Sequence, residues 1–167
     1  VQLKSAVDLL AAEQQNIISE ARSIATSLQG KTPIVYATTY FEGVAIRFRQ
    51  QLNENAKILC GHQVIPEMNH NELVGWPSGS ERVAVIFLRD KDEYARNNTR
   101  IEINKSVISK YTPHITEIWS KGKSQIEKAI YLIHLVDWVS ILLAEVRGVD
   151  AVEVGVIDML KGELSKI

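Results

Sequence analysis

The residues best suited to chemistry lie in two short polar segments between Asn53 and Trp76. The first segment reads Asn-Glu-Asn-Ala-Lys and carries the carboxylate of Glu54, and the second, residues 65–76, carries the imidazole of His70. Carboxylates and imidazoles in partly desolvated sites can take up and release protons near neutral pH. These residue types therefore indicate general acid–base chemistry, in which a side chain moves a proton between two atoms of a substrate.

A helix predicted over residues 41–53 positions the glutamate, because its apolar residues recur at helical spacing and Glu54 follows at its carboxyl end. Arg47 and Gln51 share a flank with Glu54, since positions i, i+4 and i+7 nearly align at 3.6 residues per turn. We expect both side chains to orient the carboxylate and to contact a substrate.

The surrounding elements alternate between strand and helix. Strands are predicted at residues 32–39, 82–89 and 114–120, and helices at 3–28, 41–53, 67–74, 93–111, 124–147 and 154–166. Residues 57–66 fit either a strand or a loop. This order predicts one domain over residues 1–167, a three-layer α/β sandwich of the flavodoxin type with a mainly parallel sheet. Such sheets bind ligands beyond the carboxyl ends of their strands.

Thr38 and Thr39 lie where the first strand turns into the second helix. Backbone N–H groups at such a turn can bind an anion, so both threonines are candidate substrate-binding residues. Turns of this kind are common, and these two residues could equally well be structural.

Composition excludes several classes of partner. The 19 basic and 20 acidic residues balance, which gives no field that favours nucleic acid or an anionic membrane. Cys60 is the single cysteine and cannot form a disulfide within the chain, which favours a cytoplasmic location. No spacing of His, Cys, Asp and Glu is typical of a metal site.

The helix at 124–147 is apolar on almost every side. Its interruptions by His134, Asp137, Ser140 and Glu145 argue against a membrane span. A helix this apolar must be covered on several faces, so we predict that it lies in a subunit or domain interface.

The two polar segments resemble the signature of the bifunctional phosphoglucose/phosphomannose isomerase family. The resemblance is concentrated between Arg47 and Trp76 and extends, through the order of strands and helices, to the closing Ile-Asp-Met-Leu-Lys at 157–161. It implies that the chain is the C-terminal sugar isomerase (SIS) domain of an enzyme with two such domains. A helical pattern that begins directly after Val1 agrees with a domain cut from a longer protein.

The family interconverts fructose 6-phosphate with glucose 6-phosphate and mannose 6-phosphate through a cis-enediol. The resemblance implies that Glu54 is the base that moves the proton between C1 and C2. It also implies that His70 assists ring opening from the neighbouring subunit of a homodimer, and that Lys161 lies near the ring oxygen. A positioned carboxylate can carry out these proton transfers, so no metal or nucleotide cofactor is expected.

The sequence departs from the family in two respects. The phosphate-binding serine and threonine loop of the family lies in the N-terminal SIS domain, and no comparable loop is present here, so we expect that domain to be a missing partner. The family also has a threonine before the closing lysine that is associated with both C2 epimers. Residues 149–160 contain no threonine, serine or glutamine, so activity on mannose 6-phosphate is the less secure expectation.

Simpler interpretations remain open at this stage. Glu54 could be a solvated acid at a helix end, His70 could cap a loop, and Lys161 could complement a helix dipole. The chain could then be a non-catalytic SIS module that binds a phosphosugar as a signal, or a dimerisation domain.

Overall fold

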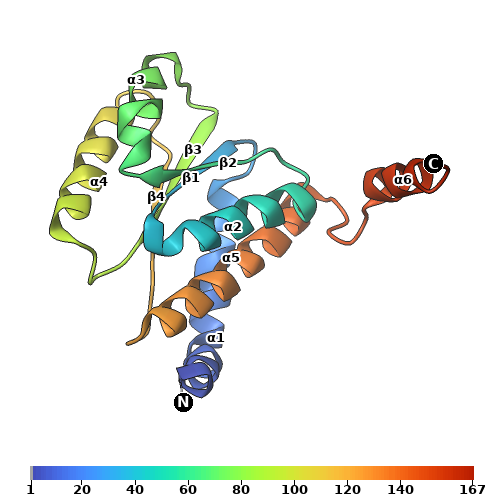
Figure 1. The fold of residues 1–167 in the computed structure, drawn as a ribbon, viewed down its shortest axis with the longest axis horizontal. Helices are drawn as coiled ribbons and strands as arrows, with labels where there is room; N and C mark the ends of the chain where they lie inside the picture. Colours follow the sequence, from blue (N-terminus) through green and yellow to red (C-terminus); the bar gives the residue numbers. More distant parts are fainter. Residues whose placement is uncertain (1) are drawn as a thin grey trace.

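The computed structural model describes residues 2–167, and a sheet of four parallel strands lies at its centre (Figure 1). The spatial order is β2-β1-β3-β4, with every neighbouring pair parallel. The strands are β1 (Thr32–Thr38), β2 (Gly61–Ile65), β3 (Val83–Arg89) and β4 (Ile115–Trp119). Residues 57–66, which fitted either a strand or a loop, contain β2.

Helices cover both faces of the sheet, which confirms the predicted three-layer sandwich (Figure 1). One face packs against α1 (Gln2–Ser27), α2 (Glu42–Glu54) and α5 (Gln125–Arg147). The other packs against α3 (Glu72–Gly75), α4 (Ala95–Ile108) and the 3₁₀ turns at Glu67–His70 and Trp76–Ser78. Side chains of β3 alternate between the two cores, with Ile86 in the first and Phe87 in the second. This explains why the strand is apolar throughout.

Helix α5 has clear start and stop signals. Ser124 and Glu127 form a reciprocal capping box at its start, and Gly148 ends it in the left-handed conformation. Part of its apolar surface is covered inside the chain by α1, α2 and the sheet, whereas Ile126 is 41% exposed and Ile141 43% exposed, so the predicted interface stays a prediction. Within residues 2–167 it is the one helix long and apolar enough to span a membrane, and half of that window is buried in the domain.

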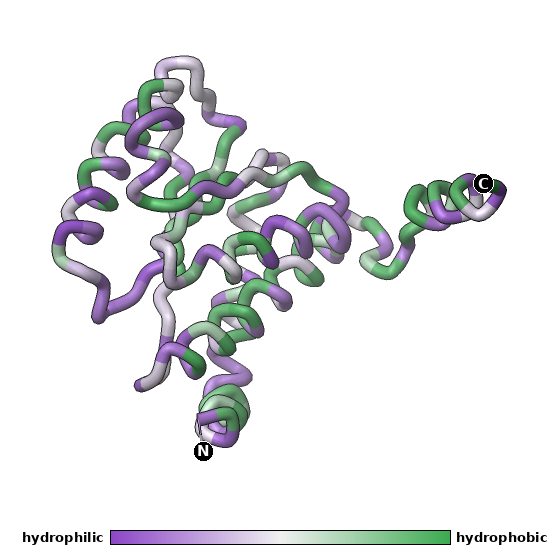
Figure 2. The backbone as a smooth tube through the Cα atoms, viewed as in Figure 1, coloured by the Kyte–Doolittle hydropathy of each residue, from purple (hydrophilic) through white to green (hydrophobic). Residues whose placement is uncertain are grey.

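Helix α6 (Gly155–Leu164) stands away from the other elements and has no buried residue (Figure 1). Apolar positions nevertheless recur along it (Figure 2), with Val156 77% exposed and Met159 64% exposed. An isolated helix of this length is marginal in water, so α6 lacks the packing that would stabilise it.

Candidate active site

Glu54 lies at the amino edge of the sheet. Helix α2 runs back from the carboxyl end of β1 towards the start of β2, so its last residue, Glu54, is at the opposite edge from Thr38. An open cleft of about 340 Å³ surrounds the exposed side chain of Glu54. The cleft is lined by Asn53, Glu54, Lys57, Ile58, Leu59, Glu153, Val154, Val156 and Ile157. A site built on Glu54 therefore does not follow the expectation that ligands bind at the carboxyl ends of the strands.

Lys57 closes one end of this cleft. Its ammonium donates hydrogen bonds to the backbone carbonyl oxygens of Glu54 and Glu153. The first of these residues ends α2, and the second lies in the connection between α5 and α6. The lysine therefore joins the end of the glutamate's helix to the start of the last helix.

Arg47 and Gln51 were expected to orient the carboxylate of Glu54, but both contact other partners. Arg47 forms a bidentate ion pair with Asp137 of α5, with N–O distances of 2.9 and 2.7 Å, and these hydrogen bonds raise the pKa of the guanidinium. Gln51 accepts a hydrogen bond of 2.9 Å from Asn55, which also donates to Ser140. These contacts form a polar seam that fixes α2 against α5, so both residues position the glutamate's helix instead of its side chain.

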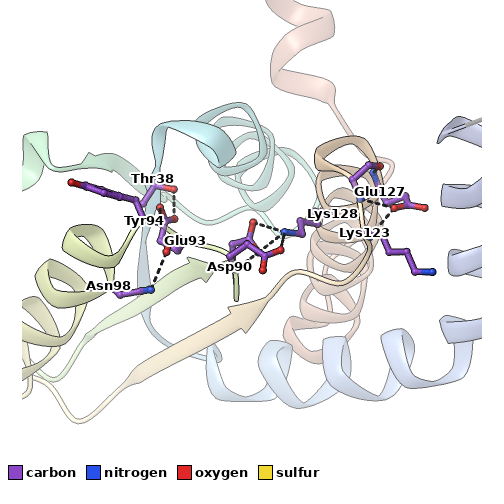
Figure 3. Close-up of polar contacts among 10 residues, drawn as sticks. Thr38, Asp90, Glu93, Tyr94, Asn98, Lys123, Glu127 and Lys128 are labelled. Atoms are coloured by element: carbon purple, nitrogen blue, oxygen red, sulfur yellow. Dashed lines mark hydrogen bonds and ion pairs between the residues drawn. The ribbon is translucent and has the colours of Figure 1, made fainter.

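Thr38 and Thr39 are not brought near Glu54. Glu54 is the last residue of α2, and this helix of 13 residues, about 20 Å long, begins just beyond the two threonines. The hydroxyl of Thr38 donates a 2.7 Å hydrogen bond to the carboxylate of Glu93, and Figure 3 shows the two side chains pointing toward each other. The Thr38 hydroxyl thus has an internal carboxylate as its partner, and binding of an anion by the backbone N–H groups of this turn stays a prediction.

His70 lies at the other end of β2 from Glu54, on the surface. The five residues of β2 span about 16 Å, so one copy of the chain does not bring His70 into its own Glu54 cleft. The neighbouring asparagines are anchored: Asn69 donates to Asn104 of α4, and the side chain of Asn71 caps α3. This anchoring leaves the exposed imidazole of His70 presented on a fixed backbone.

Lys161 is exposed on α6, one helical turn beyond Ile157. Residues four apart lie on the same face of a helix, and Ile157 lines the Glu54 cleft. Lys161 itself does not line the cleft. Of the predicted catalytic residues, Glu54 is the one that lines it, and the role of Lys161 stays a prediction.

The residues that sequence reasoning missed are the ones that hold the site together. Lys57 belongs to the same polar segment as Glu54, but its carbonyl partner at Glu153 is distant in the sequence. Asp137 and Ser140 were noticed only as polar interruptions of an apolar helix. Their spacing of three residues places them on one face, which was the available signal that they meet a common partner helix. No group of three or more His, Cys, Asp or Glu residues suited to a metal is found between residues 2 and 167.

Cys60 comes directly after Leu59, which lines the cleft, and its thiol is expected to be unreactive. Burial raises the pKa of its thiol to about 12, against a weaker opposing effect of Arg49. The thiolate is the reactive form, so iodoacetamide at pH 8 should label the folded protein on the order of 10²-fold more slowly than the unfolded protein. Mass spectrometry of native and guanidinium-unfolded samples measures both rates, and rapid labelling of the native sample would contradict the assigned burial.

The parallel sheet between two helical layers makes this protein an α/β sandwich, and a cleft that carries a carboxylate lies at one edge of the sheet. The same fold occurs in the C-terminal domain of glucosamine-fructose-6-phosphate aminotransferase from Francisella tularensis. That structure matches with a TM-score of 0.73 and 13% identity over 90% of this chain and 45% of that chain, a likeness that concerns the fold alone.

The sequence comparisons are more specific. The chain belongs to the family described as bacterial phospho-glucose isomerase C-terminal SIS domain, whose model matches residues 17–164. The bifunctional phosphoglucose/phosphomannose isomerase of Aquifex aeolicus is 32% identical over 99% of this chain. The D-glucosamine-6-phosphate 4-epimerase of Sulfolobus acidocaldarius is 36% identical over 64% of this chain. The chain spans 52% and 35% of the lengths of these two relatives.

Proposed function

We propose that the full-length protein is a cytoplasmic aldose–ketose isomerase that interconverts fructose 6-phosphate with glucose 6-phosphate and, less securely, with mannose 6-phosphate. The observation that carries this proposal is the cleft at the end of α2. It contains the Glu54 carboxylate on a helix end that Lys57 fixes, and it is bordered by the first turn of α6, the helix that carries Lys161. Family membership and relatives named as phosphoglucose/phosphomannose isomerases support the same reaction.

In this mechanism Glu54 takes the proton from the carbon next to the carbonyl of the open-chain sugar. The C–H electron pair forms the C1–C2 double bond, the former carbonyl oxygen O2 gains a proton and a cis-enediol results. The O1 hydroxyl then loses its proton as the C1 carbonyl forms, and Glu54 returns its proton to C2. The carboxylate is exposed and at the end of a helix, so it can reach two adjacent carbons of one substrate without a change in the backbone. Lys161 is assigned to the ring oxygen, where an ammonium can donate a proton during ring opening.

The histidine of the active site, His70, is assigned to a second copy of the chain. The distance along β2 keeps His70 out of the cleft of its own chain, whereas its exposed position makes it available to another molecule. A homodimer in which each subunit places His70 at the Glu54 of its partner accounts for both observations.

Binding of the substrate's phosphate group is assigned to the N-terminal half of the full-length protein. The cleft is open, α6 has no packing partner among residues 2–167, and the chain spans about half the length of its relatives. A phosphate-binding domain seated on the apolar side of α6 would bury that helix and close the cleft. The substrate would then lie between the two halves, with its phosphate on one and C1 and C2 on the other.

A 4-epimerase of glucosamine 6-phosphate is the second candidate, because one relative at 36% identity carries that name. The two reactions change different carbons: isomerisation changes C1 and C2, whereas 4-epimerisation inverts C4. Product analysis by NMR of the full-length protein with fructose 6-phosphate and with glucosamine 6-phosphate separates the two functions.

Isomerisation in D₂O tests the proposed chemistry directly. Fructose 6-phosphate incubated with the full-length protein should give glucose 6-phosphate with deuterium at C2 in a measurable fraction of molecules, because a carboxylic acid exchanges its proton with solvent. The deuterium at C2 is measured by NMR and mass spectrometry. Conversion without any deuterium would indicate a hydride shift and remove Glu54 as base, and absence of conversion would reject the isomerase function.

A further inference from the structure

Lys57 has an unusual backbone conformation. Its φ is +55°, and it is the non-glycine residue with positive φ among residues 2–167. Residues with a Cβ seldom adopt this left-handed region, and where a turn alone requires it, glycine or asparagine is usual. A glycine here would relieve the backbone but would lose the side chain, so the role of this position depends on the ammonium.

The ammonium forms a bridge between two segments of the chain. It donates to the carbonyl oxygen of Glu54 at 2.6 Å and to that of Glu153 at 2.5 Å. The last carbonyl groups of a helix lack partners within the helix, and a lysine is one of the side chains that can satisfy them. The carbonyl of Glu153 comes from a connection that is 96 residues further along the chain.

The bridge sets how the two sides of the cleft are spaced. Glu54 and the start of α6 both line the cleft, and Lys57 lines it as well. The side chain of Glu153 continues the connection by accepting a hydrogen bond from Gly155, the first residue of α6. A single lysine is thus linked through short contacts to the helix end that carries Glu54 and to the first turn of the helix that carries Lys161.

We propose that Lys57 is a positioning residue for the isomerase reaction, which fixes the carboxylate of Glu54 relative to α6 and Lys161. The proposal rests on the proposed function, because it assigns Glu54 and Lys161 to the same substrate. Lys57 acts here through the two backbone carbonyls, and no contact with substrate is required.

The test is Lys57→Met in the full-length protein, with Lys57→Arg as the rescue variant and Lys31→Met as the matched control. Lys31 also donates to a backbone carbonyl, that of Glu81, but it does not line the cleft. We expect Lys57→Met to lower kcat about tenfold with a smaller change in KM, since misplacement of reacting groups affects the chemical step. Arginine can donate to two carbonyls and should restore part of kcat, and Lys31→Met should leave kcat unchanged.

The kcat per molecule of folded protein and hydrogen exchange separate positioning from a loss of fold. A positioning role lowers kcat per molecule of folded protein, whereas unfolding lowers only the amount of active protein. Amide exchange in residues 153–158 should also become faster, while exchange in β1 and β3 stays unchanged. This second readout does not depend on catalysis.

The outcomes distinguish the two proposals. An active wild-type protein whose Lys57→Met variant keeps its kcat and its exchange rates would overturn the positioning role. A kcat loss that matches the loss of folded protein would overturn it too. An inactive wild-type protein would reject the isomerase function and, with it, the positioning role, although faster exchange in residues 153–158 would still identify the bridge as structural.

Discussion

Replacement of Glu54 with glutamine is expected to lower kcat of the full-length protein on the order of 10³-fold, the size of effect that loss of a general base produces. Glutamine keeps the shape of the side chain but cannot accept the substrate proton. The position is an exposed helix end, so the free energy of unfolding should change by less than about 0.5 kcal/mol. KM should stay within a few-fold, because binding of the phosphate is assigned to the other half of the protein.

The assay follows glucose 6-phosphate formation from fructose 6-phosphate for the wild type, Glu54→Gln and a control, Glu42→Gln. Glu42 lies on the same helix, but at its opposite end, about 18 Å away. The control should retain full activity. Undiminished turnover in Glu54→Gln would reject the assignment of the base, and an equal loss in both variants would show that the helix, not the carboxylate, is what matters.

The same variant also tests whether the site is shared between subunits. Glu54→Gln and His70→Ala are each expected to be nearly inactive alone. In a mixed dimer, however, one of the two sites receives the intact Glu54 of one subunit and the intact His70 of the other. Random reassociation of equal amounts should therefore restore about one quarter of wild-type activity, since half of the dimers are mixed and each has one intact site. No recovery after verified exchange of subunits would place both residues in one chain.

Much of the fold could be predicted from the sequence because local patterns and long-range packing agree. The apolar run of β3 is buried on both faces, and α5 begins and ends where its serine cap and Gly148 indicate. The polar segment around Glu54 was also recognisable, because such residues are out of place in a connection between core elements. Where local pattern and final environment coincide, sequence reasoning is reliable.

The remaining features depend on partners that a single segment does not reveal. Helical spacing placed Arg47 beside Glu54, but the free energy of a bidentate ion pair with Asp137 drew it toward α5 instead. Thr38 was expected at an anion-binding turn, and the structure shows its hydroxyl donating to the internal carboxylate of Glu93. The apolar surface of α5 suggested an interface; α1 and α2 cover part of it, while Ile141 is 43% exposed, so the interface stays a prediction. Each of these partners comes from a segment distant in sequence, and a periodicity argument contains no information about it.

Lys128 provides the largest expected effect on stability. Its side chain is 6% exposed, and its ammonium lies 2.8 Å from a carboxylate oxygen of Asp90, whose side chain is 7% exposed. It also contacts Asp92, at 2.5 Å (Figure 3 shows the contact with Asp90). Burial by itself would lower the pKa of Lys128, but the hydrogen bonds to the two aspartates outweigh it and leave the pKa raised. The lysine therefore stays charged in the folded protein.

Lys128→Met should lower the free energy of unfolding by about 3 kcal/mol at pH 7, because it leaves the carboxylate of Asp90 buried without its counter-ion. Urea denaturation measures this loss. The control is Lys4→Met, which breaks an ion pair whose side chains are 79% and 64% exposed and should cost less than about 0.5 kcal/mol. If both variants lose the same small amount, the buried pair contributes no more than a surface pair.

A double variant shows whether an uncompensated charge is the cause of this loss. Asp90→Asn combined with Lys128→Met should lose less free energy of unfolding than Lys128→Met alone, because the amide carries no charge. An equal loss in the two variants would mean that lost packing, not charge, destabilises the domain.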